Sequence, residues 1–224
     1  MTIELRNVWF TYPGLKRWVL RNVNYLFNDN KTYAILGPNG AGKTTLMKLI
    51  ALLYRPNKGS IITWGYEYWK LPKDRRLSIR RRIVYVHEKS ILLKGDVLYN
   101  IAFGLIIRGV KRDEALSEAL RILKDLNLDY LATRDTSALS MGEAQLISII
   151  RAIIIKPKFL LLDEPLAHID IDKREAILNM LRMLKRDYGI TLIISTHDVS
   201  VAKVLADEIL VIREGTINKM RQLS

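Results

Sequence analysis

The alternation of apolar and polar positions predicts three β-strands in the first third of the chain. These segments are residues 3–10, 18–27 and 32–36. Turn-forming residues separate them, beginning with Pro13 and Gly14. The third segment is a short, mainly apolar run that leads directly into a glycine-rich segment.

Apolar residues recur at helical spacing in four later segments, which are residues 45–54, 113–126, 140–155 and 173–186. Short apolar runs predict further strands at residues 159–162, 191–194 and 209–212. The first two runs have the continuous apolar character of strands in a parallel sheet. Strand and helix therefore alternate at both ends of the chain, with a mainly helical block between them. This order favours an α/β core interrupted by a helical insertion.

Composition excludes several classes of protein. No segment approaches the roughly 18 apolar residues that a membrane-spanning helix needs. The first residues carry a charge pair where a signal peptide would be apolar. Because there is no cysteine, a disulfide framework and a thiolate metal site are both excluded. We therefore expect a soluble protein of a reducing compartment, with no regulatory domain appended after the last strand.

The net charge of +13 raises the question of an anionic partner. Much of the excess lies in residues 73–82, which contain five arginines. Three interpretations stay open: attraction to nucleic acid, attraction to an anionic membrane surface, and a solvated charged face of the thermophile type. Charge by itself does not choose among them.

The glycine-rich segment between the third strand and the first helix matches the phosphate-binding loop pattern. Its glycines let successive backbone N–H groups point at phosphate oxygens, and the following helix adds its positive end. Lys43 is predicted to reach the β- and γ-phosphates, and Thr44 to offer a hydroxyl to Mg²⁺. The predicted ATP-binding residues of this segment are Gly37, Pro38, Asn39, Gly40, Ala41, Gly42, Lys43, Thr44 and Thr45.

Two further strands end in residues that suit phosphate chemistry. Asp163 closes the apolar run 159–162 and is expected to hold the Mg²⁺ shell, and Glu164 beside it is expected to be the general base for an attacking water. His197 follows residues 191–194, where an imidazole can donate to a γ-phosphate oxygen. Simple charged strand ends are the structural alternative. The presence of Glu164 argues against a switch that binds nucleotide without turnover.

The segment that opens the helix at residues 140–155 admits two interpretations together. Ser140 with Glu143 forms the pattern of an N-terminal capping box. A capped helix N-terminus with Gly142 and an accessible serine is also an anion site.

These motifs, in this order and at these spacings, resemble the nucleotide-binding subunit of an ABC transporter. The most distinguishing part is residues 139–143, which look like that family's signature sequence. The resemblance implies a P-loop NTPase (RecA-like) core with an antiparallel β subdomain and an inserted helical subdomain. It implies one domain over residues 1–224, with residues 1–88 and 156–224 as the catalytic lobe and 89–155 as the helical, signature-bearing lobe.

The resemblance also implies roles for particular residues. Tyr12 matches the aromatic residue that stacks on adenine; the alternative is a turn tyrosine. Asp170 matches a loop that communicates across a head-to-tail homodimer or paralogous heterodimer, in which Ser140, Gly142 and Glu143 of one subunit complete the ATP site of the other. The catalytic residues are then Lys43, Glu164 and His197, and the Mg²⁺ ligands are Thr44, Asp163 and Glu88.

Three positions depart from the family pattern. Met141 stands where glycine is usual, and Glu88 stands where glutamine normally contacts Mg²⁺ and water. Glutamate can also ligate Mg²⁺, but it adds negative charge beside the phosphate. The loop that contains His168 and Asp170 also differs from its usual form. These departures put the rate and the coupling in doubt more than ATP binding.

Residues 93–105 resemble the region that receives a helix of the membrane partner, although part of this segment must be ordinary core. The resemblance thus implies an ATP-hydrolysing motor subunit that drives a separate integral membrane permease, at the cytoplasmic face of the membrane. The sequence of this region resembles importers of the oxyanion type more closely than exporters. The alternative is a non-transport ATPase of the same family, acting in DNA repair, translation or cofactor assembly; we expect no nucleic-acid partner.

Overall fold

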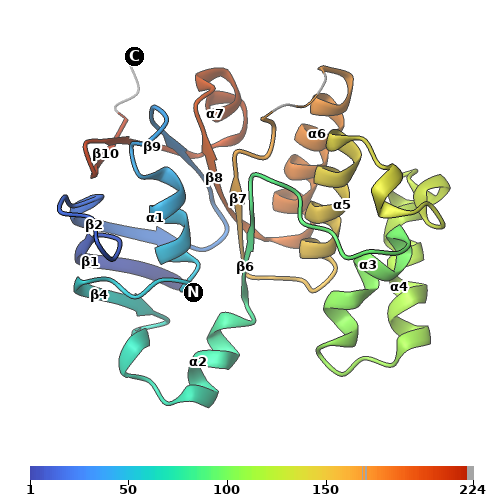
Figure 1. Cartoon of the computed structure of the whole chain (residues 1–224), viewed down its shortest axis with the longest axis horizontal. Coiled ribbons are helices and arrows are strands. Elements are labelled where there is room, and N and C mark those ends of the chain that lie inside the picture. Colours follow the sequence, from blue (N-terminus) through green and yellow to red (C-terminus); the bar gives the residue numbers. More distant parts are fainter. Residues whose placement is uncertain (168, 170, 221–224) are drawn as a thin grey trace.

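The computed structural model describes residues 1–167, 169 and 171–220. Two sheets and their flanking helices make up this part of the chain (Figure 1). The smaller sheet has the strand order β2-β1-β4-β5 and the larger one β10-β9-β3-β8-β7-β6. The α/β core that the sequence predicts and the antiparallel β subdomain that the resemblance implies are therefore both present.

The smaller sheet is antiparallel throughout. β1 (Thr2–Phe10) pairs with β2 (Leu20–Asn28) on one side and with β4 (Lys58–Thr63) on the other, and the short β5 (Tyr66–Glu67) pairs with β4. Inward-facing residues of β1 alternate with exposed ones and pack on the larger sheet, with Ile3, Leu5 and Val8 almost wholly buried.

The larger sheet gathers several strand ends at one edge. β3 (Thr32–Leu36), β6 (Ile83–Val86), β7 (Phe159–Asp163), β8 (Thr191–Thr196) and β9 (Glu208–Arg213) run parallel, and β10 (Thr216–Lys219) is antiparallel to β9. In register, Leu36 lies opposite Thr196, and Asp163 lies opposite Ser195. Because the carboxyl ends of parallel strands meet at one edge, the segments after β3, β7 and β8 converge there.

Helices enclose the larger sheet and build the insertion. They are α1 (Lys43–Ile50), α2 (Lys73–Arg80), α3 (Val97–Ile106), α4 (Arg112–Asp125), α5 (Met141–Ile153), α6 (Ile171–Tyr188) and α7 (Val199–Leu205). Among the described residues, no helix is both long enough and apolar enough to cross a bilayer.

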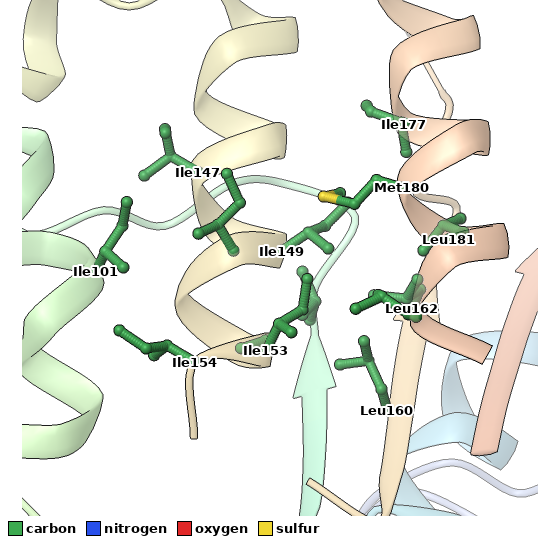
Figure 2. Packing of buried hydrophobic residues seen from close by; sticks show 14 of the residues in the cluster. Ile101, Ile147, Ile149, Ile153, Ile154, Leu160, Leu162, Ile177, Met180 and Leu181 are labelled. Carbon is green, nitrogen blue, oxygen red and sulfur yellow. The ribbon is translucent and has the colours of Figure 1, made fainter. Parts of the chain in front are cut away.

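One apolar core joins the insertion to the sheet. Figure 2 shows Ile149 and Ile153 of α5 packed between Leu160 and Leu162 of β7 and the α6 side chains Met180 and Leu181. On the other side of α5, Ile101 of α3 lies beside Ile147 and Ile154. The division into lobes at residues 89 and 155 stays a prediction, since this core is continuous across it.

Several boundaries differ from the predicted ones for physical reasons. The first helix was predicted to reach residue 54 but ends at Ile50, because Leu52 takes a left-handed backbone conformation with φ 59°. The strand predicted over residues 18–27 begins at Leu20. The apolar pattern also gave no prediction for α2 or β4. Neither buries more than a few side chains, so neither has a strong apolar periodicity.

Candidate nucleotide site

The glycine-rich segment lies between β3 and α1, and other atoms approach its backbone so closely that glycine is needed there. A Cβ atom added to Gly37 would meet Ile212 Cγ2 and the Ile212 carbonyl oxygen at 2.7 Å each. Gly42 precedes α1 with φ 106°, a conformation that strains other residues. The backbone therefore packs closely on β9 and turns sharply into the helix.

Lys43 is buried at the first turn of α1, and its ammonium group is held by the loop itself. Nζ donates to the carbonyl oxygens of Gly37 at 2.8 Å and Pro38 at 3.3 Å. The same nitrogen lies 3.2 Å from Oε1 of Glu164. In this conformation Lys43 connects the phosphate loop to the carboxylate after β7.

Asp163 is buried at the end of β7 and receives hydrogen bonds from two hydroxyl groups. The Tyr85 hydroxyl donates to Oδ2 at 2.8 Å, and the Ser195 hydroxyl donates to Oδ1. Burial, together with the negative charge of Asp163, raises the pKa of Tyr85 far above its usual value. Tyr85 therefore stays protonated and donates at neutral pH, which orients the carboxylate.

Glu164 contacts both of the other predicted catalytic residues. Its backbone has φ 46° and its N–H donates to the carbonyl oxygen of Ser195 at 3.1 Å and the hydroxyl at 3.0 Å. Its Oε2 lies 3.0 Å from Nδ1 of His197. Its Oε1 is buried and lies 3.2 Å from the Lys43 ammonium. A carboxylate oxygen held in this way beside Lys43 is available to accept a proton from a water in the cleft.

His197 follows β8 and is exposed. The next residue, Asp198, holds the backbone of this loop in place. Asp198 caps α7 by accepting from the N–H groups of Ser200 and Val201, and it also pairs with Arg174 of α6. The Ser200 hydroxyl and then Arg174 hold the pKa of Asp198 well below its usual value. The loop that carries His197 is therefore anchored on both sides.

Tyr12 lies at the mouth of the same region. Its hydroxyl shares a hydrogen bond of 2.9 Å with Oγ1 of Thr45. Its ring meets Phe10 and Tyr54 edge to face, with centroids 5.1 and 5.9 Å away. The structure therefore connects Tyr12 directly to the start of α1, and this aromatic cluster sets the orientation of its ring.

A cleft of about 1170 Å³ brings most of the predicted site residues together. Thr44, Glu88, Glu164 and His197 line it, and so does Met141, which is 72% exposed. Apart from Met141, the predicted site left out nine of the described lining residues: Leu15, Arg17, Val19, Arg174, Leu166, Ala167, Ile169, Thr196 and Asp198. Closeness in the sequence was the one available signal: the first three lie near Tyr12, and Thr196 and Asp198 flank His197.

The signature segment reaches the cleft of its own chain only through Met141. Ser140 and Glu143 form the predicted capping box: the Ser140 hydroxyl accepts from the Glu143 N–H at 3.3 Å, and the Ser140 N–H donates to Oε2 of Glu143 at 2.7 Å. Arg134 also contacts Glu143 at 3.1 Å. Ser140, Gly142 and Glu143 are not among the described residues that line the cleft. His168 and Asp170 lie outside the described residues.

The donor set fits a small hard cation shared with a substrate. Within the described residues, no group of three or more His, Cys, Asp or Glu side chains forms a protein-only metal cage. Asp163, whose carboxylate is oriented by Tyr85 and Ser195, and Thr44 at the start of α1 would supply oxygen ligands. Such a set suits Mg²⁺, which keeps few protein ligands and completes its shell with phosphates and water.

A phosphate loop between a buried parallel strand and a helix, with a carboxylate pair at the end of a neighbouring strand, defines a P-loop nucleotide-binding protein. The family model for "ABC transporter" matches residues 20–167. The chain belongs to this family.

Individual relatives agree with this assignment. The chain is 33% identical over 219 residues to a spermidine/putrescine import ATP-binding protein of Mesoplasma florum, covering 97% of this chain and 61% of that protein. It is 33% identical over 218 residues to a methionine import ATP-binding protein of Burkholderia lata, covering 96% and 63%. The chain thus spans about three fifths of the length of these relatives.

Solved structures share the whole fold. A dimeric ATP-binding cassette in a post-hydrolysis state, bound to ADP and phosphate, has a TM-score of 0.87 and 28% identity, covering 99% of this chain and all of the other. Another neighbour is CbiO1 of Clostridium perfringens, described as part of the ABC transporter complex CbiONQ, with a TM-score of 0.85, 26% identity, and coverage of 96% and 86%.

Proposed function

We propose that this chain is the ATP-binding and ATP-hydrolysing motor subunit of an ABC importer. The observation that carries the proposal is the contact chain from Lys43 in the phosphate loop through Glu164 to His197. It joins three strand ends at one cleft. Relatives named as import ATP-binding proteins support transport over a non-transport ATPase.

The phosphate loop and α1 would hold the nucleotide. Backbone N–H groups of the phosphate loop and the α1 N-terminus would donate to the polyphosphate, and Lys43 would exchange its loop carbonyls for phosphate oxygens. Tyr12, with Leu15 and Val19 beside it in the cleft, offers an apolar surface to the adenine.

Glu164 would then take a proton from the attacking water while His197 donates to a phosphate oxygen. Thr44 and Asp163 would hold Mg²⁺, with Glu88 facing the same space. The bound cation would neutralise negative charge on the phosphates. Tyr85 and Ser195 keep the Asp163 carboxylate aimed for that contact.

The working unit would be a head-to-tail dimer. Ser140, Gly142 and Glu143 do not line the cleft of their own chain, and the α5 N-terminus that they form would meet the phosphates bound by a second chain. Neighbouring structures described as dimers support this arrangement. The partner is a second copy or a paralogous chain.

An apolar groove of about 460 Å³ would receive a helix of the permease. Its lining includes Ile91, Leu93, Phe103, Ile107 and Ile155, and Ile91 and Ile107 are 69% and 62% exposed. An apolar groove of this kind suits an amphipathic helix. Docking there would hold the chain peripherally at the cytoplasmic face of the membrane. The proposal leaves the cargo open, because relatives of similar identity are named for polyamines and for methionine.

Phosphate release measured with Mg²⁺ and ATP tests this function. Lys43→Ala should reduce turnover by at least about a hundredfold, because it removes a positive charge from the transferring phosphate. Lys48→Ala, a lysine change in the same helix, is the matched control and should leave turnover near the wild-type rate. Equal turnover in all three proteins would overturn the proposal.

A further inference from the structure

A second hollow, separate from the nucleotide cleft, has four cations among its eight described lining residues. We call it the basic hollow; its key residues are Asp74, Leu77, Arg81, Arg82, Arg108 and Lys156, and its volume is about 310 Å³. Figure 1 places α2, which carries the first of these residues, at the opposite edge of the molecule from α7. None of the residues of α2 is buried.

Positive charge in the basic hollow is poorly balanced. Asp74 is the one carboxylate among its described lining residues. Within the part of the chain that the structure describes, no ion pair joins Arg81, Arg82, Arg108 or Lys156 to a carboxylate. Burial and the neighbouring charge of Arg81 both lower the pKa of Arg108. An anion bound here would relieve this repulsion.

The basic hollow is built on a rigid frame. The Arg108 guanidinium donates to the carbonyl oxygen of Arg81 at 2.7 Å and to that of Ile155 at 3.3 Å. One side chain thus ties the end of α2, the turn after α3 and the end of α5 together. Beside these cations stand two exposed apolar side chains, Leu77 at 52% and Ile107 at 62%. Cations interspersed with exposed aliphatic tips are typical of surfaces that lie against a bilayer.

The basic hollow lies next to the apolar groove in which the permease is proposed to dock. This step of the inference rests on the proposed function. Ile155 lines both the groove and the basic hollow. Ile107 and Tyr85 line both the groove and a third depression that also contains Arg81 and Arg108. A membrane protein seated in the groove would therefore lie directly beside these cations.

We propose that the basic hollow binds the headgroups of anionic phospholipids next to the permease. Phospholipid phosphates complement the unpaired arginines, and Leu77 can contact the acyl boundary. Nucleic acid is the competing anion. None of the described residues that line the basic hollow is aromatic, so no base could stack on them, and base stacking contributes much of single-strand binding.

Flotation of the purified chain with vesicles tests the proposal directly, without any permease. Vesicles of phosphatidylcholine alone are compared with vesicles containing phosphatidylglycerol, at low and high salt. The test variant is Arg81→Glu/Arg82→Glu. The matched control is Lys203→Glu/Arg213→Glu, which changes the net charge equally on exposed residues of α7 and β9. A single-stranded oligonucleotide serves as a competitor.

We expect binding that requires phosphatidylglycerol and weakens with salt. Each basic residue near an anionic surface raises partitioning about fivefold, so the test variant should bind roughly 25-fold less or weaker still. The control should lose much less. Equal loss in both variants, salt-independent binding, or complete displacement by the oligonucleotide at low concentration would overturn the proposal. Wild-type ATP turnover with no vesicle binding would defeat this inference alone, whereas absent turnover would defeat the proposed function.

Discussion

The hydroxyl of Tyr85 donates a 2.8 Å hydrogen bond to Oδ2 of Asp163, which links β6 to β7 directly beneath the nucleotide cleft. Asp163 is only 1% exposed, so its carboxylate depends on this hydroxyl and on that of Ser195. The relationship explains how a buried carboxylate can keep one fixed orientation without a cation partner.

Tyr85→Phe should therefore loosen Asp163 without opening a cavity. A hydrogen bond to a charged group contributes about 1.5–3 kcal/mol, so we expect the free energy of unfolding to fall by about that amount. The Mg²⁺ concentration that gives half-maximal ATP turnover should also rise. Urea unfolding and Mg²⁺ titration check both effects. Tyr66→Phe, at a 54% exposed position, is the control, and equal effects from the two changes would refute the role of Tyr85.

The exposed Glu88 adds negative charge at the cleft, where it also helps to raise the pKa of Tyr85. Glu88→Gln removes that charge and should change the Mg²⁺ dependence of turnover. Phosphate release measured across a Mg²⁺ titration checks this. If both the dependence and the maximal rate stay unchanged, the assignment of Glu88 to the metal shell is wrong.

Ser140 can be probed for its two roles separately. Ser140→Ala removes the cap hydroxyl and should lower stability by about 1 kcal/mol. Ser140→Asp keeps an N-cap acceptor, so stability should be retained, but it places a negative charge where the phosphate of a second chain would lie. We expect ATP-dependent dimerisation to be lost in Ser140→Asp despite normal thermal unfolding. Normal dimerisation in that variant would limit Ser140 to a capping role.

Glu208 predicts a specific acid sensitivity. Hydrogen bonds from Lys219, Lys31 and Tyr25 lower the pKa of Glu208 to about 2. Because the pKa of Glu208 is lower in the folded state, its ionised carboxylate stabilises the folded protein at any pH above the unfolded-state pKa, near 4.5. This stabilisation is lost as the pH falls toward 2. Because Lys31 and Lys219 are 41% and 62% exposed, we expect only about 1 kcal/mol.

Urea unfolding of the wild type and Glu208→Gln at pH 7 and at pH 3 measures this contribution. The difference between the two proteins should be present at pH 7 and smaller at pH 3. Glu175→Gln, at a 64% exposed side chain, provides the baseline. A difference that grows on acidification would contradict the assigned direction.

The sequence was most informative where one short segment carries both the fold and the chemistry. Gly37 to Thr44 could be identified because the loop needs glycine at fixed spacing, and Asp163 with Glu164 because they follow a wholly apolar strand. The pairing of Tyr85 with Asp163 could not be predicted, since the two residues are 78 positions apart and meet only through the β6–β7 register. The basic residues of α2 were visible as a charge excess, but their grouping with Arg108 and Lys156 depends on tertiary contacts.

The most direct test of the central claim is Glu164→Gln, analysed by phosphate release and by size-exclusion chromatography with Mg²⁺ and ATP. Replacing the carboxylate removes the proposed base and keeps the shape of the side chain. We predict that turnover is abolished and that an ATP-bound dimer accumulates, whereas the nucleotide-free variant elutes as a monomer. Undiminished hydrolysis, or a variant that stays monomeric with ATP, would contradict the account.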